Sequence, residues 1–155
     1  MKKLVYLISP NKINHKFCSD LDKVLSYKNV NYFQLRFKNI KNNKLLKFVK
    51  KIKKITSKYK VKLIINDDFI LASKIGADGC HMGQRDGSFK IARYKLKNKI
   101  LGITCHNSKT FAKNAIRNKA DYIAFGSFFK SNLKPKAKKA NLDILRWAKK
   151  NIKKP

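Results

Sequence analysis

Two carboxylates in the middle of the chain, Asp67 and Asp86, have the chemistry expected of a metal site. The 155 residues include 39 Lys and Arg but only eight acidic residues, all Asp, and four of the eight fall between residues 63 and 86. Asp67 and Asp86 each follow a short apolar segment, in the sequences LIIND and CHMGQRD. Because Mg²⁺ is commonly held by one or two carboxylates together with substrate phosphate oxygens, the pair predicts a Mg²⁺ site that serves a small phosphorylated substrate.

Polar side chains spaced by two residues accompany these carboxylates. In the segment QLRFK, strand alternation would turn Gln34, Arg36 and Lys38 to one face and the two apolar residues between them to the other. Three polar groups on an inward face are costly unless they meet a ligand. Arg36, Lys38 and the more distant Lys134 would balance the phosphate charge.

The segments that must position these residues alternate between apolar runs and amphipathic stretches. Short apolar runs predict strands, and lysine-rich stretches with an apolar stripe predict helices. We expect strands over 3–9, 32–37, 61–67, 79–83, 100–105 and 122–126, and helices over 17–28, 43–58, 69–76, 88–97, 108–119 and 142–154. Asp68 would cap the third helix and Asn141 the last.

This order is a βα unit repeated six times, which predicts a parallel sheet with right-handed crossovers. An internal echo, GADGCHMG at 76–83 and KADYIAFG at 119–126, favours a barrel over an open sheet. We therefore expect one α/β domain over 1–155, a TIM (β/α)8-type barrel that is incomplete, with about six units present. Reactive groups of a barrel lie at the carboxyl ends of its strands. The candidates that follow strands are Asn66, Asp67, Asp86, Thr104, Ser131 and Lys134.

The echo also separates two aspartates from the candidate site. Asp78 and Asp121 stand just before a strand, not after one. They would lie at the opposite end of the barrel, so we expect both to be structural.

Composition limits the classes of partner. A net charge of +31 predicts attraction to nucleic acids at low salt. The basic residues are mostly Lys, spread along the whole chain, so we expect no specific nucleic-acid recognition.

No apolar run approaches the ~20 residues that cross a membrane, and the N-terminal apolar run is interpreted as a strand, not as a signal peptide. The three cysteines lack metal or redox spacing, which indicates reduced thiols in a cytoplasmic protein.

The segments QLRFK, IND, ADGCHMGQRD, GITCH and ADYIAFGSFFKSNLK occur in this order along nearly the whole chain. Together they resemble the successive motifs of the thiamine-phosphate synthase family. The resemblance implies a transferase of thiamine biosynthesis that joins hydroxymethylpyrimidine diphosphate to thiazole phosphate and releases pyrophosphate. It also implies a dissociative reaction, in which diphosphate leaves before the thiazole nitrogen attacks. The residues agree with this, because they suit a leaving diphosphate and include no nucleophile triad.

The resemblance also assigns roles, although it identifies no certain catalytic residue. The implied pyrimidine contacts are Gln34 and Thr104, the second of which is more often Ser in the family. The implied diphosphate ligands are Arg36, Lys38, Asn66 and Lys134. The implied Mg²⁺ ligands are Asp67 and Asp86, and Ser131 would contact the thiazole phosphate. The chain departs from the family at Phe37, which replaces Glu, at Leu133, which replaces Thr, and in lacking strands 7 and 8.

Alternative roles stay open at several positions. His106 could move a proton, as a His does in the related thiazole tautomerases, but a loop histidine is more often structural. Cys105 beside His106 lacks the third group that nucleophilic catalysis requires. We expect His81 to be a packed core residue, and Arg36 could pair with Asp67 without any ligand.

Two other functions are therefore carried forward: a thiazole tautomerase-like enzyme, and a non-catalytic basic module that binds phosphate or nucleic acid. The complete Gln-x-Arg-x-Lys pattern favours the synthase. Six units would leave the first and sixth strands as open edges, which predicts weak stability or self-association. Without strands 7 and 8, which in the family bind the thiazole phosphate, we also expect impaired turnover.

Overall fold

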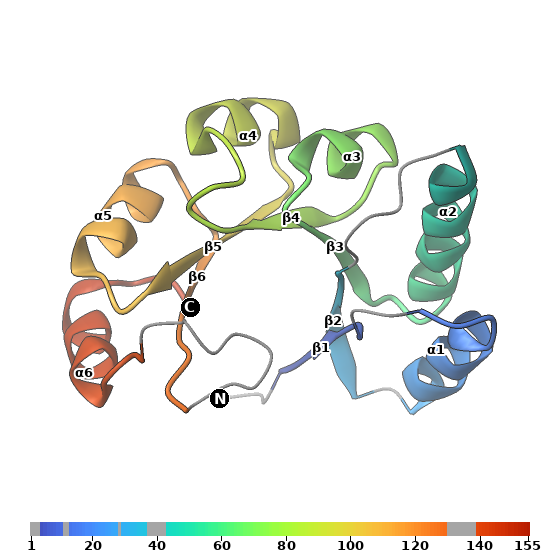
Figure 1. The fold of residues 1–155 in the computed structure, drawn as a ribbon, viewed down its shortest axis with the longest axis horizontal. Helices are drawn as coiled ribbons and strands as arrows, with labels where there is room; N and C mark the ends of the chain where they lie inside the picture. The colour runs from blue at the N-terminus through green and yellow to red at the C-terminus, as the bar shows by residue number, and fades with distance from the viewer. Residues whose placement is uncertain (1–3, 11–12, 28, 37–42, 130–138) are drawn as a thin grey trace.

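The computed structural model describes residues 4–10, 13–27, 29–36, 43–129 and 139–155. These residues form six parallel strands in sequence order, each followed by a helix. The elements are β1 (Val5–Ile8), α1 (Phe17–Ser26), β2 (Val30–Leu35), α2 (Asn43–Lys58), β3 (Lys62–Asn66), α3 (Phe69–Lys74), β4 (Gly79–Met82), α4 (Phe89–Leu96), β5 (Ile100–His106), α5 (Lys109–Arg117), β6 (Tyr122–Phe125) and α6 (Leu142–Asn151). Figure 1 shows the strands on the inner side of an arc and the helices on its outer side. The prediction of an incomplete βα barrel with six units is confirmed.

The hydrophobic core lies between the sheet and the outer helices. Leu63 and Ile65 of β3 point toward the helices and are fully buried, and they belong to one cluster with Val49 and Ile52 of α2. Between them on β3, Ile64 is also buried but lies outside this cluster, as strand alternation requires. The core therefore fixes which residues of each strand face inward.

Polar side chains begin four of the helices, as the sequence predicted for two of them. Asp68 caps α3 by accepting a hydrogen bond from Leu71 N at 2.7 Å, and Asn141 caps α6 by accepting one from Ile144 N at 3.2 Å. Both predicted caps are confirmed. Ser88 and Ser108 cap α4 and α5 in the same way.

The two aspartates of the sequence echo have equivalent structural roles. Asp78 precedes β4, and its Oδ2 accepts from Leu63 N of β3 at 2.9 Å and from Lys53 Nζ at 2.5 Å. Asp121 precedes β6, and its Oδ2 accepts from Leu101 N of β5 at 2.8 Å and from Arg93 Nη2 at 2.6 Å. Each carboxylate thus ties one βα unit to the next, which agrees with the structural role that the sequence predicted.

Replacing Asp78 by Ala should lower the free energy of unfolding by about 2 kcal/mol, because Leu63 N–H and the Lys53 ammonium both lose their acceptor. Burial raises the pKa of Asp78, but the bonds and charges of Lys53, Leu63 and Lys62 together bring it below its usual value. Urea unfolding measures the change. Asp22→Ala is the matched control, because Asp22 forms an exposed pair with Lys58, and such pairs contribute at most about 1 kcal/mol. Equal losses in the two variants would contradict the structural role of Asp78.

The two ends of the strand order are β1 and β6. After α6 the chain returns to β6, where Ile123 N donates to Pro155 O at 2.9 Å. None of the described helices is both long and apolar enough to cross a membrane.

Candidate active site

A cavity of about 600 Å³ lies at the carboxyl ends of the first five strands. Its lining residues are Ile8, Gln34, Arg36, Asn66, Asp67, His81, Gly83, Gln84, Arg85, Asp86, Thr104 and His106. Six of the site residues predicted from the sequence are therefore brought together: Gln34, Arg36, Asn66, Asp67, Asp86 and Thr104. The other three, Lys38, Ser131 and Lys134, lie outside the described residues. The assigned roles stay predictions.

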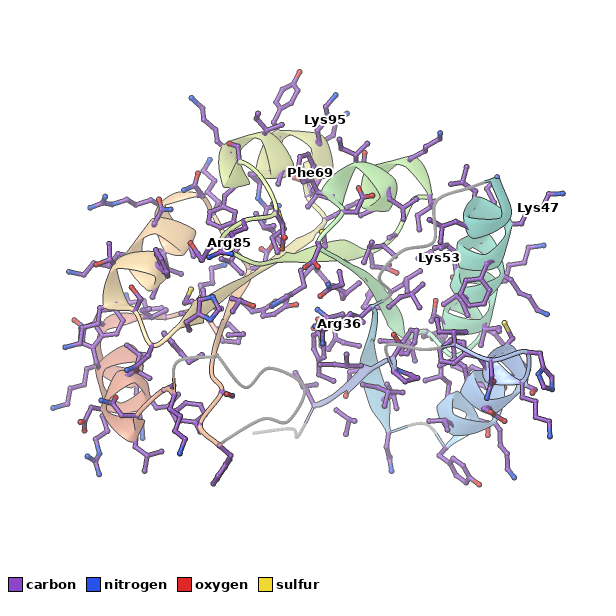
Figure 2. The ribbon with its side chains drawn as sticks, viewed as in Figure 1. Arg36, Lys47, Lys53, Phe69, Arg85 and Lys95 are labelled. Carbon is purple, nitrogen blue, oxygen red and sulfur yellow. The ribbon has the colours of Figure 1, made fainter. Side chains whose placement is uncertain are left out.

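The cationic side of the cavity begins at the end of β2. Gln34 is buried, and Arg36 lies half-buried on the inner side of the arc, whereas Lys47 and Lys95 lie on its outer side (Figure 2). The hydroxyl of Ser9, after β1, donates to Arg36 O at 2.9 Å and accepts from Arg36 N at 2.8 Å. Ser9 thereby fixes the backbone of Arg36, and sequence reasoning missed it.

Asp67 lies where β3 leaves the sheet. Its φ of 66° is in the left-handed region, which Asp and Asn tolerate better than most residues. Its backbone N–H donates to His81 O of the neighbouring strand β4 at 2.7 Å. The bend at the end of β3 is thus held by β4. Asp67 and Arg36 line the same cavity, which is required both for a shared site for Mg²⁺ and diphosphate and for a direct ion pair between the two residues.

Asp86 is fixed by the turn that follows β4. Its Oδ2 accepts from Gly83 N at 2.6 Å. A Cβ at Gly83 would stand 3.1 Å from the same oxygen, so glycine allows this close approach. The turn presents a carboxylate of set orientation in the lining of the cavity that Asp67 also lines.

The donor set of this cavity suits a hard cation. No group of three or more His, Cys, Asp or Glu that could hold a metal occurs in the described parts of the chain. Two carboxylates with neighbouring amide oxygens fit Mg²⁺, which keeps waters and substrate oxygens as its other ligands. They do not fit a zinc site, which needs three or four protein ligands.

His81 is the residue that sequence reasoning placed wrongly. It lies in β4 and is half-buried, but its ring faces the cavity and not the core between sheet and helices. Its Nε2 lies 2.7 Å from Thr104 Oγ1 and its Nδ1 lies 2.8 Å from the Tyr122 hydroxyl. Burial lowers the pKa of His81 to about 4, against a smaller opposing effect of the Asp86 charge. The imidazole is therefore neutral at pH 7.

A sequence signal for the position of His81 did exist. Cys80 and Met82, on either side of it, are apolar and fully buried. Strand alternation places a residue between two core residues on the opposite face. Applied to β4, this rule puts His81 on the inner face, with Gln34 and Thr104.

A cysteine nucleophile next to His106 is excluded by the geometry. Cys105 is fully buried, its Sγ donates to Ile103 O at 3.6 Å, and burial raises its pKa to about 12. It is therefore a protonated thiol at neutral pH. His106 is exposed, has a φ of 52° and lines the cavity, so a role in proton transfer stays a prediction.

The fold and this cavity define the class of the protein: a βα-barrel protein with its site at the carboxyl ends of the strands. The family model described as thiamine monophosphate synthase matches residues 5–155. The thiamine-phosphate synthase of Pelagibacter ubique (strain HTCC1062) is 53% identical over 150 residues, which cover 96% of this chain and 72% of the relative. That of Erythrobacter litoralis (strain HTCC2594) is 37% identical over 148 residues, 92% of this chain and 70% of the relative.

A solved structure agrees with the sequence comparisons. The thiamine phosphate pyrophosphorylase from Pyrococcus furiosus superposes with a TM-score of 0.83 at 25% identity, covering 99% of this chain and 72% of that one. The chain belongs to the thiamine-phosphate synthase family. The resemblance stated from the sequence motifs is thereby confirmed, together with the enzyme class of the family.

Proposed function

We propose that this chain joins hydroxymethylpyrimidine diphosphate to thiazole phosphate and releases pyrophosphate, as a step of thiamine biosynthesis in the cytoplasm. The observation that carries the proposal is that six predicted site residues line one cavity. They come from the ends of β2 and β3, from the turn after β4 and from β5. Membership of the thiamine-phosphate synthase family supports it.

In this proposal, the residues divide between the two ends of the first substrate. Gln34 and Thr104 contact the pyrimidine ring, while Arg36, Lys38, Asn66 and Lys134 bind the diphosphate. Ser131 contacts the phosphate of the thiazole. Asp67 and Asp86 hold Mg²⁺, which when bound neutralises part of the diphosphate charge.

The reaction needs charge stabilisation rather than a nucleophilic side chain. The bond between the methylene carbon and the diphosphate oxygen breaks, and its electron pair leaves with pyrophosphate. The thiazole nitrogen then gives its lone pair to the methylene carbon, and no proton has to be transferred. Fixed cations such as Arg36 stabilise the charge that develops on the leaving group, and the Ser9 contacts hold the Arg36 backbone in place for this task.

The test is product formation by the 155-residue chain with both substrates and Mg²⁺. We expect thiamine phosphate and pyrophosphate in a 1:1 ratio, and loss of both with EDTA. Calorimetric titration with the pyrimidine diphosphate alone, with and without EDTA, should show at least about 10-fold weaker binding without Mg²⁺. This second measurement tests the contacts on the described strands separately from turnover. Equal affinity in both conditions would contradict the metal assignment, and absence of both binding and product would contradict the function.

Two further parts of the proposal concern partners. The chain acts on small phosphorylated molecules, and its attraction to nucleic acid is unspecific and screened by salt. Association between copies would take place through β1 and β6, the ends of the strand order.

A further inference from the structure

Four side chains form a continuous chain of hydrogen bonds that ends at the cavity. The Tyr6 hydroxyl of β1 lies 2.6 Å from the Tyr122 hydroxyl of β6, which lies 2.8 Å from His81 Nδ1 of β4. His81 Nε2 lies 2.7 Å from Thr104 Oγ1 of β5. The chain thus links the first strand with the last, and Thr104 is its one member besides His81 that lines the cavity.

Ring packing holds the same groups in place. The His81 and Tyr122 rings stack with centroids 5.5 Å apart, and Tyr6 meets Tyr122 edge-on at 5.8 Å. A Cβ at Gly102 would overlap the Tyr122 ring, so glycine at that position of β5 makes room for it. These contacts leave the heavy atoms little freedom to move. The hydrogen-bonded chain from Tyr6 to Thr104, called the relay below, can therefore change only in the positions of its hydrogens.

A neutral imidazole has one donor and one acceptor nitrogen, so the chain can run in one of two directions. In the first, Tyr6 donates to Tyr122, Tyr122 donates to His81 Nδ1, and His81 Nε2–H donates to Thr104, whose own hydrogen points to the cavity. In the second, Thr104 donates to Nε2, Nδ1–H donates to Tyr122, and Tyr122 donates to Tyr6.

The two directions differ at the far end of the chain. Within the described residues, the hydrogen-bond partner of the Tyr6 hydroxyl is Tyr122. Each direction leaves one hydroxyl hydrogen without a protein acceptor in the described residues: that of Thr104 in the first direction and that of Tyr6 in the second. Thr104 lines the cavity, where a ligand or water can accept its hydrogen, whereas half-buried Tyr6 does not line it. Polar groups removed from solvent are nearly always paired, so the first direction is favoured.

We infer that Tyr122 and His81 are positioning residues that make the Thr104 hydroxyl a hydrogen-bond donor into the cavity, so that the site selects an aromatic ring with an unprotonated ring nitrogen at that position. The inference rests on the proposed function, in which Thr104 contacts a pyrimidine. It adds the polarity of that contact and the residues that set it.

Two variants separate the positioning role from simple loss of a buried hydroxyl. Tyr122→Phe removes the donor to His81 Nδ1, so the preference for one tautomer weakens. Tyr6→Phe also removes a tyrosine hydroxyl, but one that contacts Tyr122 and not His81. Tyr122 then ends the chain, and His81 Nδ1 is still the acceptor of its hydrogen. The direction therefore survives in Tyr6→Phe, which makes this variant the matched control.

The first measurement is the tautomer of His81 in the ligand-free protein, read from the ¹⁵N shifts and long-range ¹H–¹⁵N couplings of its ring. We expect the Nε2–H tautomer in the native chain and in Tyr6→Phe, and a mixture in Tyr122→Phe. The Nδ1–H tautomer in the native chain would overturn the inferred direction, whatever the protein binds.

The second measurement is the affinity, in the presence of Mg²⁺, for hydroxymethylpyrimidine diphosphate and for analogues with either ring nitrogen replaced by C–H. One analogue should bind about 10-fold more weakly to the native chain and to Tyr6→Phe. Tyr122→Phe should lose most of this discrimination. Equal discrimination in all three proteins would overturn the positioning role. If the tautomers are as expected but no protein binds the diphosphate, the direction stands and the proposed function fails.

Discussion

Asp86→Asn should lower the turnover of the pyrimidine diphosphate by about 100-fold, which corresponds to about 2.7 kcal/mol of transition-state stabilisation. Asn keeps the shape of the side chain, and its amide oxygen can still accept from Gly83 N, as Asp86 Oδ2 does at 2.6 Å. The turn should therefore survive. What is lost is one of the two carboxylates proposed to hold Mg²⁺, and with it charge that would draw the metal to the leaving diphosphate. Turnover measured at saturating substrate and several Mg²⁺ concentrations gives the effect.

The chain offers a matched control for this variant. Asp68 is next to Asp67 in sequence, is exposed, and caps α3 through Leu71 N. Asn is as good a cap as Asp, so Asp68→Asn removes the same charge from the same region with little structural effect. It should keep at least half of the native turnover. Similar losses in Asp68→Asn and Asp86→Asn would show that net charge near the cavity matters and that the carboxylate at position 86 does not.

Much of the fold was predictable because local patterns and tertiary packing agree. The apolar stripe of α2 predicted its bounds, 43–58, as the structure has them. The echoed Ala-Asp pairs predicted two structural carboxylates, because a residue before a strand must lie at the far end of a βα unit from the site. A boundary was wrong by two residues at β2, where apolar and polar residues do not alternate cleanly: the strand begins at Val30 and not at position 32.

The candidate site was predictable to the extent that its residues stand at strand ends. Gln34, Arg36, Asn66, Asp67, Asp86 and Thr104 could be chosen by position, since the carboxyl ends of parallel strands meet. Ser9 directly follows β1, so the same rule could have found it, although the sequence reasoning missed it. Tyr122 could not be chosen this way, because it begins β6 and its importance comes from its bond to His81, far away in sequence. The prediction for His81 was wrong because it placed the residue in the packed core, although its neighbours Cys80 and Met82 already occupy the core side of β4.

Acidification should destabilise this protein through His81, by about 2 kcal/mol between pH 7 and pH 4.5. An unperturbed histidine has a pKa near 6.5, whereas burial lowers that of His81 to about 4 in the folded state. Between these values the unfolded chain binds a proton that the native chain does not. Stability is therefore full above pH 6.5 and falls as the pH drops toward 4. Urea unfolding in EDTA at a series of pH values measures this slope without interference from divalent metal.

The contribution of the paired carboxylate Asp78 falls in a different pH range. The chain contains no Glu, and Asp78, whose pKa is lowered, contributes stability that is lost only below its usual range. His81→Gln should be less stable at pH 7 but should lose most of the slope. His106→Gln, which removes an exposed imidazole, should retain it. If His81→Gln kept the full pH dependence, the imidazole would not be held neutral between Tyr122 and Thr104, and the relay that orients the Thr104 hydroxyl would lose its physical basis.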